Sequence, residues 1–145
     1  MTHFDALKRF CAYQDRCIHD VEEKLKALGV EPELGRKYII TLQKEGFIDE
    51  FRFVESYING KINIKKWGKL KIKFHLKQKG VNQDLITKGL NNIDDDIYFQ
   101  NLKDLFKKKE LELSNEKNKL KKKQKIIRFL IQKGFDFEEI YFLIQ

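Results

Sequence analysis

The chain has 145 residues, of which 41% are hydrophobic, so it falls in the usual size range of a single domain with a core of its own. Its longest apolar runs, such as Phe129-Leu130-Ile131, are far shorter than the roughly 20 residues of a membrane-spanning helix. No apolar stretch follows the first residues, and this excludes an export signal of the usual kind. We therefore expect a soluble protein that is neither exported nor bound to a membrane.

The two cysteines, Cys11 and Cys17, favour a reducing cytoplasm, because a disulfide framework in a chain this long would need more of them. Together with His3 or His19 they could ligate zinc, but no four-ligand spacing is present. We expect both cysteines to be small packing residues on helix faces. The sequence predicts no metal and no cofactor.

The net charge of +8 is concentrated in two stretches of the chain. Residues 61–80 hold eight Lys and no Asp or Glu, a net of 8 − 0 = +8. Residues 103–125 hold ten Lys and four acids, a net of 10 − 4 = +6, so the remaining segments sum to −6. Such a pattern indicates a polyanion or an acidic protein groove as the partner. For the second stretch, a solvated surface that only keeps the protein soluble is an equal alternative.

An internal repeat is built around three glycines, Gly29, Gly80 and Gly134, which are 51 and 54 residues apart. Each glycine has a Leu four residues before it and an apolar residue directly after it. A further apolar residue lies eight positions before each glycine, so the two upstream residues share one helical face. The pattern predicts three helices that each end at a glycine in the left-handed conformation.

The other predicted helices follow from capping residues taken in chain order. One helix begins near Pro32, and the next opens after Ile48-Asp49-Glu50. Further helices begin at Asn82 or Gln83, after Ile93-Asp94-Asp95, and at Asp136 with Glu138 and Glu139. The segment from Lys103 to Lys125 is expected to hold the rest of a long helix, a turn near Ser114-Asn115, and the start of the next helix.

These elements predict an all-α protein of three tandem three-helix repeats that form an elongated, curved array. We place the repeats at residues 1–48, 49–93 and 94–145. The segment from Leu70 to Lys77 alternates apolar and polar residues and taken alone would be a strand. We expect a helix there, because its register matches the helices that end at Gly29 and Gly134.

This middle helix is apolar on two faces. Ile72 and Leu76 line one side, while Trp67, Leu70 and Phe74 fall within about 60° of one another on a different side. Our interpretation is that the helix packs between its own repeat and a neighbouring one. The alternative is that Trp67 and the nearby lysines dock a partner, because aromatic and basic residues together make effective anchors.

Several short motifs follow one another in a fixed order along the chain. The motifs are Gly46-Phe47-Ile48-Asp49-Glu50-Phe51-Arg52-Phe53-Val54, Tyr57, Trp67-Gly68, Lys71-Ile72, Leu76 and Lys79-Gly80-Val81. This order resembles that of the RecX family, whose pattern is Gly-apolar-Ile-Asp-Asp, Arg-Phe-Ala, Tyr, Trp-Gly, Ile, Leu and Lys-Gly-Ile, and the resemblance extends from Ala6 to Ile144. Glu50, Val54 and Cys17 stand where the family usually has Asp, Ala and Ser, which are changes at capping or packing positions.

The resemblance implies a modular arc that lies along the groove of the RecA–DNA filament and touches RecA and the DNA within it. It implies a non-enzymatic regulator that mostly restrains RecA in recombination, DNA repair and the SOS response. We expect a monomer. The predicted partner-binding residues are Lys65, Lys66, Trp67, Lys69, Lys71, Lys73, Lys77, Lys107, Lys108, Lys109, Lys121, Lys122 and Lys123.

Two other classes of function stay open. A stand-alone nucleic-acid-binding helical protein without sequence specificity would use the same lysines to grip phosphates. A purely structural helical-repeat adaptor would leave the charge incidental. No catalytic constellation is present: Gly35-Arg36-Lys37 lacks the spacing of a phosphate-binding loop, and Asp94-Asp95-Asp96 fits helix caps better than a magnesium site.

Overall fold

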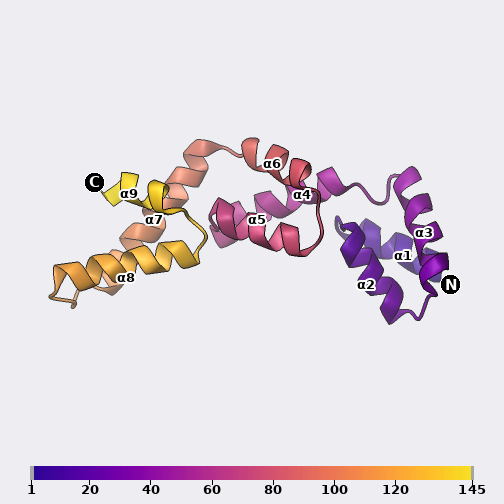
Figure 1. Cartoon of the computed structure of the whole chain (residues 1–145), viewed down its shortest axis with the longest axis horizontal. Helices are drawn as coiled ribbons and strands as arrows, with labels where there is room; N and C mark the ends of the chain where they lie inside the picture. The colour runs from indigo at the N-terminus through magenta and orange to yellow at the C-terminus, as the bar shows by residue number, and fades with distance from the viewer. Residues whose placement is uncertain (1, 145) are drawn as a thin grey trace. The chain divides into compact units, whose positions relative to one another are not determined.

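The computed structural model describes residues 2–144, and in that range every regular element is a helix (Figure 1). The elements in chain order are α1 (His3–Tyr13), α2 (Ile18–Ala27), α3 (Pro32–Lys44), α4 (Glu50–Gly60), a π-helical segment η1 (Lys61–Lys65), α5 (Lys69–Gln78), α6 (Gln83–Asn91), α7 (Asp95–Glu112), α8 (Lys119–Gln132) and α9 (Phe137–Ile144). The all-α prediction is confirmed, and so is the helix predicted for Leu70 to Lys77. No helix in the described range is both long and apolar enough to cross a bilayer.

The helix starts follow the predicted capping residues. Pro32 is the first residue of α3, where its missing amide hydrogen costs nothing. The Asp94 carboxylate caps α7 by accepting hydrogen bonds from the amides of Asp96 and Ile97. At the start of α9, the Asp136 and Glu139 carboxylates each accept from the other's backbone amide, at 2.7 and 3.0 Å. These side chains satisfy amides that the helix itself cannot pair.

The three glycine stops share one hydrogen-bonding pattern, in which Gly29 and Gly80 adopt φ +73° and Gly134 adopts φ +104°. After α2, the Val30 amide donates to the Leu25 carbonyl and the Gly29 amide donates to the Lys26 carbonyl, both at 3.0 Å. This is the Schellman motif. It brings the residue after the glycine against the Leu that lies four positions before the glycine. The motif explains why each repeat couples a Leu, a glycine and an apolar residue at fixed spacing.

The chain packs as two compact units. The first comprises the chain up to Tyr57 together with Leu76–Gly89, and the second comprises Ile58–His75 together with the chain from Leu90 onward. The helices α4, α5 and α6 therefore each contribute residues to both units. The three repeat boundaries stay a prediction, since this division follows which residues pack together and not which segments are similar.

The first unit has a core that joins α1, α2 and α3. Its buried residues are Leu7, Cys11, Val21, Leu25, Leu42 and Ile48. A second set of contacts ties the start of α2 to later helices: the Glu50 carboxylate accepts from the Ile18 amide at 2.8 Å, and the Lys79 ammonium donates to Asp20 at 2.9 Å. Lys79 directly precedes the Gly80 stop, so the C-terminal end of α5 contacts the N-terminal end of α2.

The Asp20–Lys79 ion pair predicts a pH dependence of stability. Burial opposes ionisation of Asp20, but hydrogen bonding and attraction from Lys79 outweigh it and hold the pKa of Asp20 below its ordinary value of 3.8. A depressed folded-state pKa stabilises the fold above the unfolded-state pKa, and this contribution is lost as pH falls through the folded-state pKa. We expect Asp20→Asn to cost about 1 kcal/mol at pH 7 and less at about pH 3, where part of the carboxylate is protonated.

Urea unfolding at the two pH values measures this difference. Glu23→Gln is the matched control, because its ion pair with Lys26 is largely exposed and should contribute little at either pH. An equal effect of Asp20→Asn at both pH values would contradict the assignment of the pH dependence to this pair.

The second unit has a core that α5, α7, α8 and α9 share. Ile72, Leu102, Leu130 and Ile140, one from each of these helices, are almost completely buried, and α8 runs back alongside α7 (Figure 1). Asn101 is the buried polar residue of this core, and its side-chain amide donates to the Ile62 carbonyl at 2.9 Å. That bond joins a carbonyl of η1 to a side chain of α7.

Candidate partner-binding surfaces

The lysines of the second unit are arranged around a junction between the start of α5 and the end of α8. The Gly68 amide donates to the Lys133 carbonyl at 2.7 Å, and the Leu70 amide donates to the Gly134 carbonyl at 3.0 Å. The Lys69 amide donates to the Tyr98 hydroxyl at 3.0 Å. The first amides of α5 are thus paired by the third predicted repeat instead of by a cap of their own.

Positions 68 and 134 at this junction both require glycine, because there is no space for a Cβ atom at either position. A Cβ on Gly68 would overlap the carbonyl group of Gly134 and the amide nitrogen of Phe135. A Cβ on Gly134 would in turn overlap the Lys71 Cβ, in addition to the strain of its positive φ. The two backbones consequently touch, and the Lys71 backbone lies beside Gly134.

Lysines from both basic stretches meet at this junction. The Lys133 ammonium donates to the Lys65 carbonyl at 2.9 Å, and the Lys66 ammonium lies 3.8 Å from the Asp104 carboxylate on α7. Lys108 follows Asp104 by one helical turn and therefore shares its face of α7. We call Lys65, Lys66, Lys71, Lys108 and Lys133 the junction lysines. Two causes lower the pKa of Lys133: the larger is its partial burial, and the smaller is repulsion from the other four junction lysines.

Trp67 belongs to this junction and not to the face of α5 that helical spacing predicts for it. Its ring lies 4.9 Å from the His75 ring, and the ammonium groups of Lys61 and Lys71 lie 4.6 and 4.5 Å from its centroid. The prediction was wrong because the chain turns at Lys66, whose φ of 54° is left-handed, and α5 begins only at Lys69. Helical spacing does not extend across such a turn.

The opposite surface of α5 is exposed and both apolar and basic. Leu70 and Phe74 are 53% and 58% exposed, while Ile72 and Leu76 on the inner face are fully buried. Successive residues of a helix are 100° apart around its axis, and on this measure Lys73 and Lys77 lie within 100° of both Leu70 and Phe74. We call Leu70, Lys73, Phe74 and Lys77 the α5 outer face. The interpretation that a neighbouring repeat covers this face is wrong for Leu70 and Phe74.

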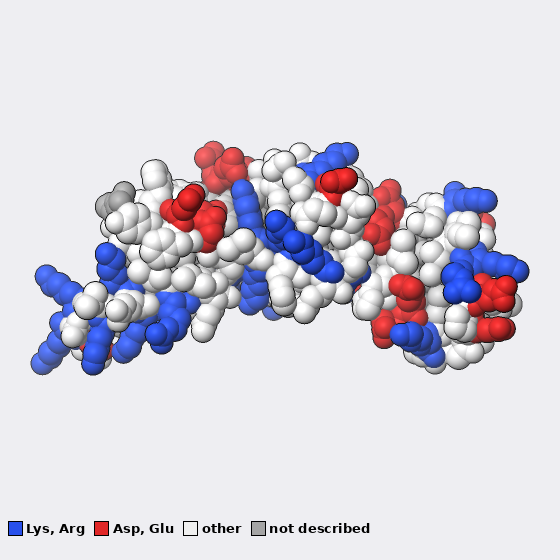
Figure 2. All heavy atoms as spheres, viewed as in Figure 1, with Lys and Arg blue, Asp and Glu red and all other residues white. Residues whose placement is uncertain are grey.

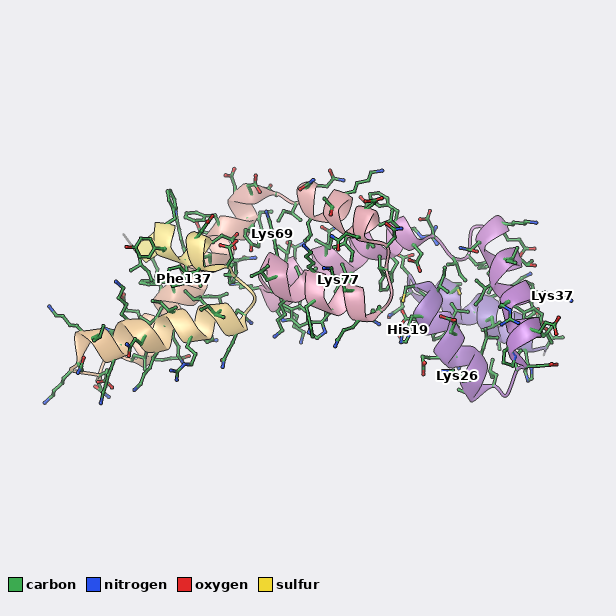
Figure 3. The ribbon with its side chains drawn as sticks, viewed as in Figure 1. His19, Lys26, Lys37, Lys69, Lys77 and Phe137 are labelled. Carbon is green, nitrogen blue, oxygen red and sulfur yellow. The ribbon has the colours of Figure 1, made fainter. Side chains whose placement is uncertain are left out.

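The other predicted lysines lie on α5, α7 and α8. Figure 3 shows Lys69 at the opposite end of α5 from Lys77, and the Lys69 ammonium lies 5.0 Å from the Tyr98 ring. Lys107, Lys108 and Lys109 belong to α7, where the Lys109 ammonium pairs with Glu112 at 3.3 Å. The first turn of α8 and the residues just after it carry Lys121, Lys122 and Lys123. They are at least ten residues from Lys133, which corresponds to about 15 Å along the helix. Figure 2 shows the blue side chains gathered over α8 and the adjoining end of α7.

Lys133 is absent from the predicted partner-binding residues, because nothing in the local sequence places it beside Lys65. The contact depends on the docking of α8 against the start of α5. Only the 54-residue spacing of the glycines hinted that Lys79 and Lys133 occupy equivalent positions.

The cysteines and acids that could have held a metal have structural positions. Cys11 is buried in the core of the first unit, and the Cys17 sulfur caps α2 by accepting from the Asp20 amide. Burial raises the pKa of the Cys17 thiol to about 11, which disfavours the thiolate that a metal needs. Within residues 2–144, no three His, Cys, Asp or Glu side chains gather as a metal-binding group.

Together, the fold and these surfaces define an all-α protein of three-helix domains with exposed basic surfaces. Residues 49–90 match the model for the second three-helix domain of RecX, and residues 95–144 match the model for the third. The chain belongs to the RecX family.

Relatives and solved structures agree with this assignment. The regulatory protein RecX of Clostridium tetani is 35% identical over 137 residues, which cover 94% of this chain and 62% of the relative. That of Clostridium perfringens strain SM101 is 31% identical over 82% of this chain and 56% of its own. The crystal structure of RecX from Lactobacillus salivarius superposes with a TM-score of 0.86 at 26% identity, and covers 99% of this chain and 92% of that one. This chain spans about three fifths of the length of the curated relatives it matches.

Proposed function

We propose that this protein is a non-enzymatic, cytoplasmic regulator that binds the RecA–DNA filament and restrains RecA in recombination, DNA repair and the SOS response. The observation that carries the proposal is the α5 outer face, where two large apolar side chains are exposed beside two lysines. Membership of a family whose relatives are named regulatory proteins supports it.

The α5 outer face has the composition of a protein-binding surface. Leu70 and Phe74 offer apolar area that a partner can bury, while Lys73 and Lys77 steer an acidic groove toward it. The inner face of the same helix is anchored by Ile72 and Leu76, so the outer face is presented on a rigid support. A rigid anchor loses little conformational entropy when a partner binds.

A filament of repeating subunits suits a protein with several basic surfaces. Each surface binds modestly, and the surfaces of one chain strengthen one another because the later ones engage at a high effective concentration. The lysines of α7 and the start of α8, at positions 107–109 and 121–123, supply the second binding surface in this proposal. A monomer is sufficient for such binding.

Charge reversal on the α5 outer face tests the proposal. We expect Lys73→Glu with Lys77→Glu to raise the concentration needed for half-inhibition of RecA's single-strand-dependent ATPase about tenfold, equivalent to about 1.4 kcal/mol. Lys37→Glu with Lys44→Glu on α3 makes the same change in charge and should leave inhibition unchanged. Circular dichroism checks that all variants keep their helices.

Two results would count against the proposal. Equal inhibition by the α5 variant and the wild-type protein would remove the α5 outer face from the interface. A wild-type protein that leaves the RecA ATPase unaffected but binds free duplex DNA tightly, with steep loss on adding salt, would favour the stand-alone nucleic-acid binder. The convergence of the junction lysines is the observation in favour of that second function.

A further inference from the structure

The junction lysines form one compact cationic site from two stretches that are separate in sequence. Lys65, Lys66 and Lys71 come from the first basic stretch, Lys108 comes from the second, and Lys133 comes from the end of α8. The direct contacts are the bond from Lys133 to the Lys65 carbonyl and the packing of Lys71 against Gly134. The backbone segments that carry Lys71 and Lys133 are joined by hydrogen bonds from the Gly68 and Leu70 amides to the Lys133 and Gly134 carbonyls.

The charge at this site is poorly compensated. Among the ion pairs formed by residues 2–144, a single carboxylate, that of Asp104, pairs with a junction lysine, at 3.8 Å from Lys66. The Lys133 and Gly134 carbonyls, which follow α8, accept from the Gly68 and Leu70 amides and not from a junction lysine. The depressed pKa of Lys133 has the same origin, because burial and four like charges make its protonated form costly. A polyanion would relieve this repulsion.

Trp67 holds part of the site in place. Two ammonium groups, from Lys61 and Lys71, lie within 4.6 Å of its ring centroid, at distances typical of cation–π contacts. Lysine side chains lose up to about 2 kcal/mol of conformational freedom when they are immobilised, and an aromatic ring that restrains them lowers this cost in advance. The ring is itself fixed against His75.

We propose that the junction lysines bind the phosphodiester backbone of a nucleic-acid strand. A strand carries one negative charge at every nucleotide, so consecutive phosphates can meet several clustered lysines, whereas an acidic peptide needs a run of Asp and Glu to do so. Lysine binds phosphate as a point charge without reading bases, which fits binding that is independent of sequence. The inference rests on the proposed function and deepens it, by assigning the DNA of the filament to the junction and RecA to the α5 outer face.

Fluorescence anisotropy with a fluorescein-labelled thirty-nucleotide oligothymidine, in the absence of RecA, tests the site. The variant carries Lys65→Ala, Lys108→Ala and Lys133→Ala, and the matched control carries Lys26→Ala, Lys37→Ala and Lys44→Ala in the first unit. We expect the junction variant to bind at least about tenfold more weakly. The slope of log K against the logarithm of the salt concentration should become about 2 less steep. Each phosphate that a lysine no longer neutralises removes roughly 0.7 from this slope. The control should keep both values near wild type.

The reverse results overturn the inference. Equal reductions of affinity in the two triple variants would mean that total charge, and not the junction, governs binding. A junction variant that keeps its oligothymidine affinity but no longer binds polyglutamate would assign the site to an acidic protein segment. Urea unfolding of both variants verifies that the fold is kept, and the single variant Lys133→Arg, which keeps the charge, should keep most of the wild-type binding.

RecA ATPase inhibition by the same proteins separates this inference from the proposed function. Junction-dependent oligothymidine binding by a protein that does not affect RecA would keep the phosphate site and overturn the filament regulator. Full RecA inhibition by a protein without junction-dependent binding would keep the regulator and overturn the phosphate site.

Discussion

Replacing Gly68 with alanine is expected to destabilise the protein by about 3 kcal/mol, because the new methyl group has no space to occupy. It would overlap the Gly134 carbonyl group and the Phe135 amide, which are backbone atoms of another helix end and cannot rotate away. Relief requires α8 to move from α5, and this breaks the hydrogen bonds from the Gly68 and Leu70 amides. Urea unfolding should show a fall of about 1 M or more in the midpoint.

Gly60→Ala is the matched control for this substitution. Gly60 closes α4 with a right-handed φ of −64°, and a Cβ there would meet nothing within 4 Å. Alanine at such a helical position should stabilise by roughly 0.5–1 kcal/mol, since it restricts the unfolded chain. If both substitutions changed the midpoint in the same direction by similar amounts, the backbone contact at the junction would be refuted.

Phe135→Ala is expected to cost about 3–5 kcal/mol, the usual range for removing a buried phenylalanine. Phe135 is 1% exposed and its ring lies 5.3 Å from that of Tyr98, which in turn pairs the first amide of α5. It also follows the Gly134 stop, so its amide closes the helix by donating to the Leu130 carbonyl. The cavity would open where the core and the junction meet, and thermal unfolding should show a large fall in Tm.

Phe142→Ala removes the same atoms from a different environment. Phe142 is 72% exposed and contacts the Phe99 ring edge-on at 5.9 Å, so we expect a destabilisation below about 1 kcal/mol. Comparable destabilisation by both substitutions would show that burial of Phe135 is not what stabilises the second unit. The same pair tests the junction, because Phe135→Ala should also weaken oligothymidine binding while Phe142→Ala should not.

The helices and their ends were predictable because their causes are local. The spacing of Leu130, Gly134 and Phe135 encodes a hydrogen-bonding pattern within one turn, and the Asp94 cap acts on amides two and three residues away. The alternating segment around Phe74 was also assigned correctly, because the repeat supplied a helical register that its own pattern lacked. Family membership followed from the same short motifs.

The parts that were not predicted depend on contacts between distant segments. The left-handed turn at Lys66 takes Trp67 out of the register of α5, and nothing in the pattern of apolar residues marks such a turn. The exposure of Leu70 and Phe74 depends on which helices pack nearby, while periodicity only reveals that a face is apolar. The π-helical segment η1 was likewise not foreseen.

The sequence by itself determined the helical class, the glycine stops and the excess of lysine in two stretches, since these follow from dihedral preferences, short-range hydrogen bonds and composition. Only the tertiary structure decided that Lys133 lies beside Lys65, that Gly68 touches Gly134, and that the two stretches converge at one junction. The physical reason is that carbonyls at the end of α8 accept hydrogen bonds from amides at the start of α5. The bond from Gly68 to Lys133 joins residues 65 positions apart, and the local sequence of neither segment predicts it.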